Sequence, residues 1–517
     1  MIENKDYKEL QNSTCIPGFI NLAPGISLES LDNQERLLTN SGIIRSVGLG
    51  EINEGTNSPY VKLSHEQVLE TLLNDLKRIN FQQRAALAEE QKLNKKHFVI
   101  IAIEAILSKA KEKNWSLCMS GGEVFIFNCE YWNQLPKDEL LNFLGKAAEK
   151  VGVGKYDARY HKFKQDLLSQ FLSTAYLPKS SKNKEEVLIN LINGTYVISS
   201  TSNGLRSFRE KDFLTYQLPF SFIPGAGCTI FDNYIERVLP NPDQQKILAE
   251  FVAYVFISHK ILKLEKSMIL HGSGANGKSV FFEIILALLG RENVSNYSLQ
   301  SLTNGQGYQR AKLSNKLMNY ASEISANMDS TLFKQMVSGE PIEARLPYGE
   351  PFILEDYAKL IFNTNELPRD VEQNEAFFRR FLILNFDVTI PETERDPELA
   401  RKIISSELPG IFNWVLRGLQ RLLTQRGFTF SQEALNAVET YKQQSDSIHL
   451  FLVEEAYQPS VTEVVALKFI YTKYKIYCQE SGYKVCSLRV FADRMRNKHF
   501  NLERRNTGTV VYAEIHL

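Results

Sequence analysis

Residues 272–279 carry the clearest chemical signal in the sequence. They read GSGANGKS, which matches the phosphate-binding pattern G-x-x-x-x-G-K-[ST], with an apolar segment (266–271) before it and another (280–290) after it. Glycines let consecutive backbone N–H groups wrap a phosphate, and a helix that begins at the loop directs its positive N-terminal end at the same group. The pattern therefore predicts a nucleotide site made of Gly272, Ser273, Gly274, Ala275, Asn276, Gly277, Lys278 and Ser279.

Two residues of this loop have distinct expected roles. Lys278 would reach the β- and γ-phosphates of a nucleoside triphosphate, and the Ser279 hydroxyl would bind Mg²⁺. The alternative is a glycine turn that binds nothing, but the complete order of strand, loop and helix favours the nucleotide site. The loop alone indicates an NTPase, a class that includes kinases, GTPases and motors.

Two later apolar segments end in side chains that can act on a γ-phosphate. KLMNYASE (316–323) ends in Glu323, where an acid would orient and polarise the attacking water. KLIFNTNELP (359–368) contains Asn363 and Asn365, either of which could sense the γ-phosphate because a side-chain amide both donates and accepts. Each segment alone also fits a plain strand followed by a turn, so the prediction depends on their order after the loop.

A pair of arginines precedes the next apolar segment. Arg379 and Arg380 lie in AFFRRFLILNF (376–386), where one guanidinium could act as a finger on the nucleotide of a neighbouring subunit. Paired arginines are also common on ordinary solvated surfaces, so this reading too depends on the motifs around it.

The elements that must position these residues follow from the hydrophobic pattern. Apolar strands before the loop and before each polar group, separated by helical segments, predict an α/β P-loop core, followed by a helical segment over 397–427. Ahead of the core, helical spacing over 64–113, a strand at 123–128, a helix at 137–152 and a strand and turn after 186 predict an α+β region. Residues 178–186 read as a linker, and residues 1–60 show little periodicity.

The combined motifs resemble a known family. The order GSGANGKS, ASE, VSGEPIEAR, FNTNELP and FFRRF is similar to the superfamily 3 helicase core of the phage/plasmid primase-helicase family, to which poxvirus primase-helicases are also similar. Flanking segments at 212–235 and 407–419 extend the resemblance to roughly residues 110–517. It implies an AAA+ ATPase that uses ATP and Mg²⁺, assembles as a ring, usually a hexamer, and unwinds DNA by moving along a single strand. The expected role is replication of a mobile element such as a phage or plasmid, with other replication proteins as further partners.

The resemblance also implies roles for individual residues. Lys278 and Ser279 become Walker A, Glu323 the Walker B acid and second metal ligand, Asn365 the sensor, and Arg379 or Arg380 the finger. Candidate DNA phosphate contacts in the core are Lys334, Arg345 and Lys359.

Two features depart from the family pattern. Walker B often carries paired acids, and here Ser322 holds the first position. The turn PYGEP (347–351) lacks the basic tip expected of a DNA-binding hairpin. No Asp-x-Asp pair occurs in the chain, so we expect a helicase without priming activity. Two alternatives stay open: an initiator-like ATPase that melts an origin, and a DNA-binding scaffold with weak ATPase.

A basic cluster lies near the carboxyl end. Between Lys484 and Arg505 there are seven basic residues and two acidic ones. A helix over 487–500 and a hairpin turning at 506–508 predict a winged-helix module. Its expected DNA contacts are Arg494, Arg496, Arg504 and Arg505, although a solvated helix face on a structural cap is the alternative.

The composition limits the classes of protein and of site that the sequence can encode. In 517 residues, 60 Lys and Arg balance 60 Asp and Glu, so affinity for DNA must come from local charge. Six cysteines without a Cys-x-x-Cys pair argue against a zinc ribbon, and no segment resembles a signal peptide or membrane span, so we expect a cytoplasmic protein. The expected divisions are 1–109 (unassigned), 110–235 (α+β), 236–395 (AAA+ core), 396–446 (helical) and 447–517 (winged helix).

Overall fold

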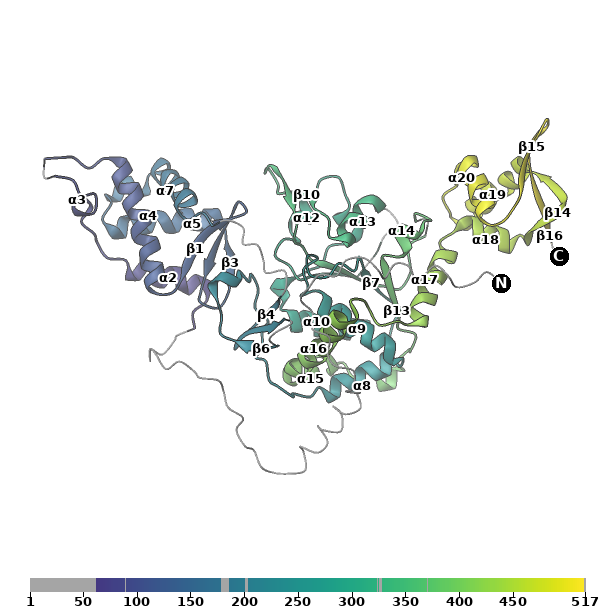
Figure 1. Ribbon diagram of the computed structural model, residues 1–517, viewed down its shortest axis with the longest axis horizontal. Coiled ribbons are helices and arrows are strands. Elements are labelled where there is room, and N and C mark those ends of the chain that lie inside the picture. Colours follow the sequence, from purple (N-terminus) through teal and green to yellow (C-terminus); the bar gives the residue numbers. More distant parts are fainter. Residues whose placement is uncertain are drawn as a thin grey trace, which may run out of the picture. The chain divides into compact units, whose positions relative to one another are not determined.

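The computed structural model describes residues 62–88, 90–177, 186–199, 203–322, 324, 328–369 and 371–515 (Figure 1). Nearly all described residues belong to one compact unit, residues 64–517. The mixture of helices with a parallel sheet agrees with the α/β prediction. Within the described residues, no helix is both long and apolar enough to cross a membrane.

The first described part is α+β, as predicted. Its helices are α2 (His65–Asp75), α3 (Phe81–Arg84), α4 (Lys95–Glu112), α5 (Lys137–Val151), α6 (Lys155–Arg159) and α7 (His161–Thr174). An antiparallel sheet joins β1 (Ser116–Ser120), β2 (Glu123–Phe127) and β3 (Trp132–Leu135). The Ser64 side chain caps α2, and Gly152, at φ 114°, ends α5. The expected boundary between residues 109 and 110 falls inside α4, so this division is wrong: α2 to α4 belong with the α+β part.

A small antiparallel sheet follows. It consists of β4 (Val187–Leu191), β5 (Gly194–Ile198) and β6 (Asn203–Arg206), and leads through a short 3-10 turn η1 (Glu210–Asp212) to α8 (Thr229–Val238) and α9 (Pro242–Tyr254). Val187, Ile189 and Leu191 of β4 lie in the same hydrophobic core as α8 and α9. The expected boundary between residues 235 and 236 falls inside α8. Of the predicted linker, residues 178–185 lie outside the described residues.

Five parallel strands form the central sheet. They are β7 (Ser267–His271), β8 (Val294–Ser295), β9 (Met318–Ala321), β12 (Lys359–Thr364) and β13 (Phe381–Asn385), in the order β13-β7-β12-β9-β8. Most of their residues are buried, which explains the continuous apolar runs in the sequence. Because the strands are parallel, their carboxyl ends meet at one edge, and β12 lies between β7 and β9. The residues after these three strands are therefore neighbours.

The connections of the sheet carry the other elements of the core. These are α10 (Lys278–Leu289), η2 (Arg291–Asn293), α11 (Leu299–Leu302), α12 (Tyr308–Ala311), α13 (Ser330–Ser338), the hairpin β10 (Ile342–Arg345) and β11 (Pro351–Leu354), and α14 (Glu375–Phe378). The short 3-10 turn η3 (Glu392–Glu394) follows β13.

The helical segment packs on α9. It contains α15 (Leu399–Ser406), α16 (Leu408–Gln425) and α17 (Gln432–Gln444). A Cβ on Gly418 of α16 would lie 2.7 Å from the backbone of Ala249 in α9, so only glycine allows this approach. Beside it, the buried Glu250 carboxylate accepts hydrogen bonds from the Arg421 side chain at 3.0 Å and from the Thr429 backbone at 2.7 Å. The two helices α9 and α16 therefore approach each other closely here, and the buried Glu250 carboxylate between them has hydrogen-bond donors.

The carboxyl-terminal module has its own core. Its elements are α18 (Ser447–Glu454), β14 (Tyr457–Ala466), α19 (Leu467–Ser481), α20 (Leu488–Asn497), β15 (Leu502–Arg505) and β16 (Gly508–Ile515), with the antiparallel order β14-β16-β15. Phe451, Tyr474 and Phe491 are fully buried in it. The predicted helix and the hairpin turning after Arg505 are both present.

Candidate functional site: a phosphate-binding loop at the edge of the sheet

The loop between β7 and α10 has the backbone conformation that a phosphate cradle needs. Gly274 has φ +108°, Ala275 +51° and Gly277 +87°. Successive backbone N–H groups in turns of this kind can form a concavity that binds anions. A Cβ on Gly274 would meet no atom within 4 Å, so there is open space beside the loop. The loop therefore fits a phosphate group.

Lys278 lies inside this loop. Its side chain is 6% exposed, and its ammonium donates hydrogen bonds to the Gly272 carbonyl at 2.7 Å and to Asn276 Oδ1 at 3.0 Å. Burial lowers the pKa of the Lys278 ammonium. The loop itself thus supplies two acceptors for this cation, where the predicted phosphates would add stronger ones.

Asn276 joins the loop to the end of β13. Its Nδ2 donates to the Phe386 carbonyl at 2.9 Å, and the side chain is 3% exposed. A Cβ on Gly272 would collide with Asn276 Nδ2 and would lie 2.6 Å from the Phe386 oxygen. The first glycine of the motif is therefore required by this tether.

A residue that the sequence analysis missed supports the other end of the loop. The Tyr234 hydroxyl, on α8, donates to the Gly277 carbonyl at 2.9 Å, and burial raises the pKa of Tyr234. A Cβ on Gly277 would lie 2.7 Å from Val238 Cγ1, so α8 packs directly against the loop. No sequence signal marked Tyr234, because its contact depends on how α8 packs.

Ser279 is the second residue of α10 and is exposed. A hydroxyl in the first turn after the loop is a suitable Mg²⁺ ligand beside a bound phosphate. Among the described residues, no group of three or more His, Cys, Asp or Glu side chains could hold a metal ion. Glu323, the predicted Walker B acid and second ligand, lies outside the described residues; β9 ends at Ala321 and Ser322 is exposed.

The two candidate sensor asparagines occupy different positions. Asn363 lies within β12 and its Oδ1 accepts a hydrogen bond from the Tyr320 hydroxyl at 3.0 Å. Asn365 follows the end of β12 and is exposed at the carboxyl edge of the sheet. It lines a cavity of about 420 Å³ together with His271, the last residue of β7. Asn365 is thus the asparagine at the edge that carries the loop.

Arg379 and Arg380 differ in burial. Arg380 is 7% exposed and donates to Ser338 Oγ at 3.0 Å, to the Lys334 carbonyl at 3.3 Å and to the Ala376 carbonyl. The Arg379 side chain is 63% exposed, with Glu265 at 3.8 Å. Arg380 therefore serves the fold internally, and its burial contradicts a role as a finger.

The predicted DNA contacts of the core also differ from one another. Lys334 forms an ion pair with Glu372 at 2.9 Å, and the exposed Arg345 donates to the Gly349 carbonyl at 2.9 Å. Lys359 is 7% exposed with its ammonium 4.2 Å from the centre of the Tyr254 ring. Because it is the buried first residue of a central strand, the prediction of a surface phosphate contact at Lys359 is wrong.

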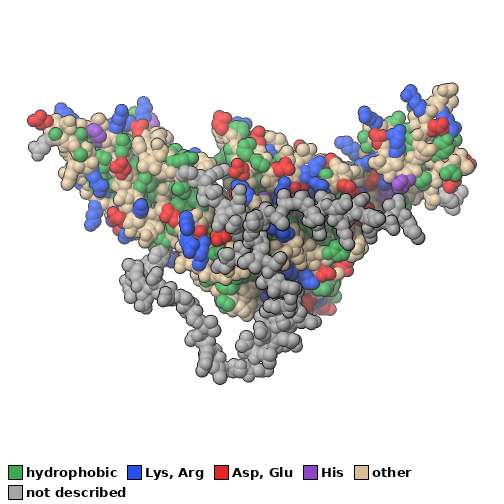
Figure 2. All heavy atoms as spheres, viewed as in Figure 1, with side chains coloured by type: hydrophobic (Ala, Val, Ile, Leu, Met, Phe, Trp, Pro, Cys, Tyr) green, Lys and Arg blue, Asp and Glu red, His purple; other side chains and the backbone are tan. Residues whose placement is uncertain are grey.

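Most of the predicted arginines of the carboxyl-terminal module have acidic partners. Arg494 pairs with Asp446 at 3.3 Å, Arg496 with Asp493 at 2.7 Å, and Arg505 with Glu503 at 2.9 Å. Arg504 is exposed on β15. Figure 2 shows Lys and Arg side chains on the visible surface of this module. The local charge is therefore less one-sided than the sequence count indicates.

Two family models match parts of the chain. Residues 270–380 match "Family of unknown function (DUF5906)", and residues 443–513 match "Poxvirus D5 protein-like". The first match contains the phosphate-binding loop, and the second contains α18 to β15 and most of β16.

Solved structures with similarity to the chain include three of the NrS-1 C-terminal region. "The A form apo structure of NrS-1 C terminal region-CTR" has 13% identity and a TM-score of 0.43, over 82% of this chain and 100% of that one. "The apo structure of NrS-1 C terminal region (305-718)" has 14% identity and a TM-score of 0.44, over 81% and 99%. The comparisons thus relate residues 270–380 to a family of unknown function and the carboxyl-terminal module to poxvirus D5-like proteins.

Proposed function

We propose that this chain is an ATP-hydrolysing DNA helicase that acts in replication of a mobile element such as a phage or plasmid. The observation that carries the proposal is the position of Lys278, held inside a glycine loop at the edge of a parallel sheet where Asn365 follows the neighbouring strand. A phosphate-binding loop, a cation and a polar side chain lie at this edge, and these are groups that phosphoryl transfer to water requires.

Each residue has a defined part in the proposed reaction. The loop N–H groups and Lys278 bind the β- and γ-phosphates, and the exposed Ser279 hydroxyl holds Mg²⁺, whose charge offsets that of the phosphates. Glu323 orients and polarises the attacking water, and Asn365 hydrogen-bonds the γ-phosphate or that water. These assignments combine the family resemblance with the position of Asn365 at the carboxyl edge of the sheet, where it lines a cavity with His271.

Arg379 is the proposed finger. Its exposure leaves the guanidinium available to a neighbouring subunit, which is the arrangement that a ring, usually a hexamer, requires. The finger acts on charge that develops in the transition state, so it affects hydrolysis more than nucleotide affinity.

DNA contact is proposed for two places. In the carboxyl-terminal module, α20 would enter a groove and the β15–β16 hairpin would serve as a wing whose Arg504 contacts phosphate. In the core, Arg345, the last residue of β10 before the turn of the β10–β11 hairpin, is exposed. The match of residues 443–513 to the poxvirus D5-like family supports a place in replication.

One observation favours a second candidate. Ser322 stands where a paired acid is often found, so a DNA-binding scaffold with weak ATPase is the alternative of a different class. ATP turnover measured with and without single-stranded DNA separates the two: the helicase is stimulated by DNA, whereas the scaffold turns over slowly in both conditions. Displacement of a long strand then separates a helicase from an ATPase that only melts an origin.

A further inference from the structure

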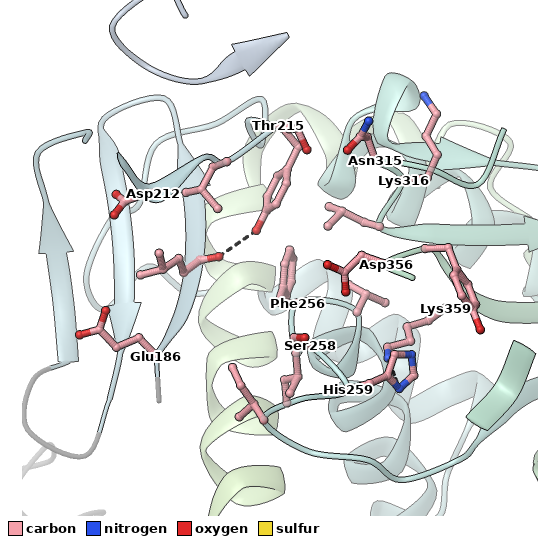
Figure 3. A pocket seen from close by; sticks show the side chains of 18 of the residues that line it. Glu186, Asp212, Thr215, Phe256, Ser258, His259, Asn315, Lys316, Asp356 and Lys359 are labelled. Atoms are coloured by element: carbon pink, nitrogen blue, oxygen red, sulfur yellow. Dashed lines mark hydrogen bonds between the residues drawn. The ribbon is translucent and has the colours of Figure 1, made fainter. Parts of the chain in front are cut away.

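A second cavity lies at the opposite edge of the central sheet. It has a volume of about 490 Å³, and its lining includes Asn315 to Leu317, just before β9, and Asp356, Tyr357 and Lys359 at the start of β12 (Figure 3). The other side is formed by residues near β4 and η1 and by residues 255–259 after α9. Because β7, β9 and β12 are parallel, this amino-terminal edge is separated from the phosphate-binding loop by the length of the strands. The cavity is thus distinct from the proposed ATP site.

The lining of this cavity has an excess of positive charge. Five basic residues (Arg206, Arg209, Lys211, Lys316 and Lys359) face three acidic ones (Glu186, Asp212 and Asp356). Arg206 is already paired with Asp212 at 2.8 Å. Lysine and arginine that outnumber acids around a cavity favour an anionic ligand.

Lys359 is the buried cation of the cavity. Its Nζ lies 2.7 Å from His259 Nε2, and the ring of Tyr254 covers another side of the ammonium at 4.2 Å. Burial lowers the pKa of the Lys359 ammonium more than the charge of the Asp356 carboxylate raises it. Burial lowers the pKa of Lys359 to about 7 and that of His259 to about 3, so His259 is a neutral acceptor at physiological pH. Burying an ammonium is costly, and an anion bound in the cavity would lower that cost.

Aromatic rings form the apolar wall. Phe256, Tyr216 and Tyr357 line the cavity, and the Tyr216 hydroxyl donates to the Leu188 carbonyl at 3.0 Å, the dashed line in Figure 3. That bond fixes the ring as a wall and keeps its hydroxyl occupied. A volume of this size suits a small organic ligand with a planar part.

We propose that this cavity binds a terminal phosphate monoester joined to a nucleoside. The phosphate, with a charge of about −2 at neutral pH, matches the surplus of two basic residues, and Lys359 donates to one of its oxygens. The base lies against the aromatic wall. The same chemistry occurs in a free nucleoside monophosphate and at the phosphorylated end of a DNA strand.

The test measures binding to the full chain carrying Lys278→Ala, which disables the loop and leaves the second cavity unchanged. The probes are thymidine monophosphate, a 5′-phosphorylated oligothymidylate and the same oligomer without the phosphate, each titrated by calorimetry. Adding Lys359→Met should weaken binding of the phosphorylated probes at least tenfold, since the methylene stem is kept and the charge is lost. Lys402→Met is the matched control, because Lys402 is exposed on α15 and pairs with Asp396 at 2.6 Å.

The outcomes separate the sources of the ligand. Tight binding of the mononucleotide identifies a free nucleotide, and binding of the phosphorylated oligomer alone identifies a strand end; both support the site. A second double variant at the mouth, Arg209→Gln with Lys211→Gln, should also weaken binding, without touching the core. Equal affinity in the presence and absence of Lys359→Met, or no binding of either phosphorylated probe, overturns the proposal. ATP turnover of the wild-type chain is unaffected by that outcome, so the proposed function is tested separately.

Discussion

Asn276 bridges Lys278 and the end of β13. Its Oδ1 accepts a hydrogen bond from the Lys278 ammonium at 3.0 Å, while its Nδ2 donates to the Phe386 carbonyl at 2.9 Å. At the other end of the same strand, the Arg380 carbonyl accepts from the Ser267 backbone N–H at 2.8 Å. The position of the lysine in the loop is therefore coupled to the strand that follows the arginine pair.

Asn276→Ala should reduce ATP hydrolysis while the chain stays folded. The change removes one acceptor of Lys278 and leaves the buried Phe386 carbonyl without its donor, at a cost of about 1–3 kcal/mol in the free energy of unfolding. We expect the value of kcat/KM for ATP to fall about tenfold or more, because a displaced cation no longer meets the phosphates. Steady-state kinetics together with thermal unfolding measure both effects; wild-type kcat/KM in the variant would contradict the assigned tether.

Arg379→Ala and Arg380→Ala should behave differently. Loss of the exposed Arg379 should lower hydrolysis by about 10³-fold or more without changing stability or ATP affinity. Loss of the buried Arg380 should instead destabilise the chain by about 2–4 kcal/mol, because Ser338 and two carbonyls lose their donor.

Mixing provides the control for the finger. Arg379→Ala subunits combined with Lys278→Ala subunits should regain part of the activity where an intact finger faces an intact loop. Co-assembled mixtures without any regained activity would argue against a site shared between subunits.

In the carboxyl-terminal module, the effect of reversing an arginine's charge should depend on whether that arginine has a partly buried acidic partner. Arg496→Glu with Arg504→Glu should weaken DNA binding for all sequences and reduce the salt dependence by about two units, one for each phosphate contact. Arg494→Glu should mainly destabilise the module, because it places a carboxylate against Asp446. Salt titrations of binding to forked and duplex DNA measure the first effect. Wild-type affinity of the double variant over the titration would show that this face is only solvated.

Lys359→Met should stabilise the chain around neutral pH. Burial lowers the pKa of Lys359 to about 7 in the folded state, from about 10.4 in the unfolded chain. Between these values the unfolded state binds the extra proton, so this residue makes the free energy of unfolding rise with pH above 7, by at most about 1.4 kcal/mol per pH unit. His259 and Asp356 also face the ammonium, but the folded pKa of His259, about 3, places its own effect at lower pH.

The measurement is the difference between wild type and Lys359→Met, with urea unfolding at pH 7, 8 and 9. The difference in the free energy of unfolding between the two proteins should be largest at pH 7 and should become smaller as the pH rises. A gap that stays constant over this range would mean that Lys359 titrates normally.

The loop and the strands around it could be predicted from the sequence because their signals are local. The glycines of 272–279 and the apolar runs before Asn363 and Glu323 depend on nearby residues alone. Contacts between distant segments could not be predicted. Spacing does not tell which of two adjacent arginines points inward, and it cannot show that Lys359 begins a strand buried on both faces. Two predicted boundaries fell inside α4 and α8, because composition changes do not mark where one helix ends.

Strand displacement on forked DNA tests the central claim most directly. Wild-type chain with ATP and Mg²⁺ should displace a labelled strand, and Lys278→Ala, which loses the cation at the β- and γ-phosphates, should displace none while keeping its fold by circular dichroism. Displacement by Lys278→Ala at the wild-type rate, or ATP turnover by the wild type without any displacement, would contradict the account.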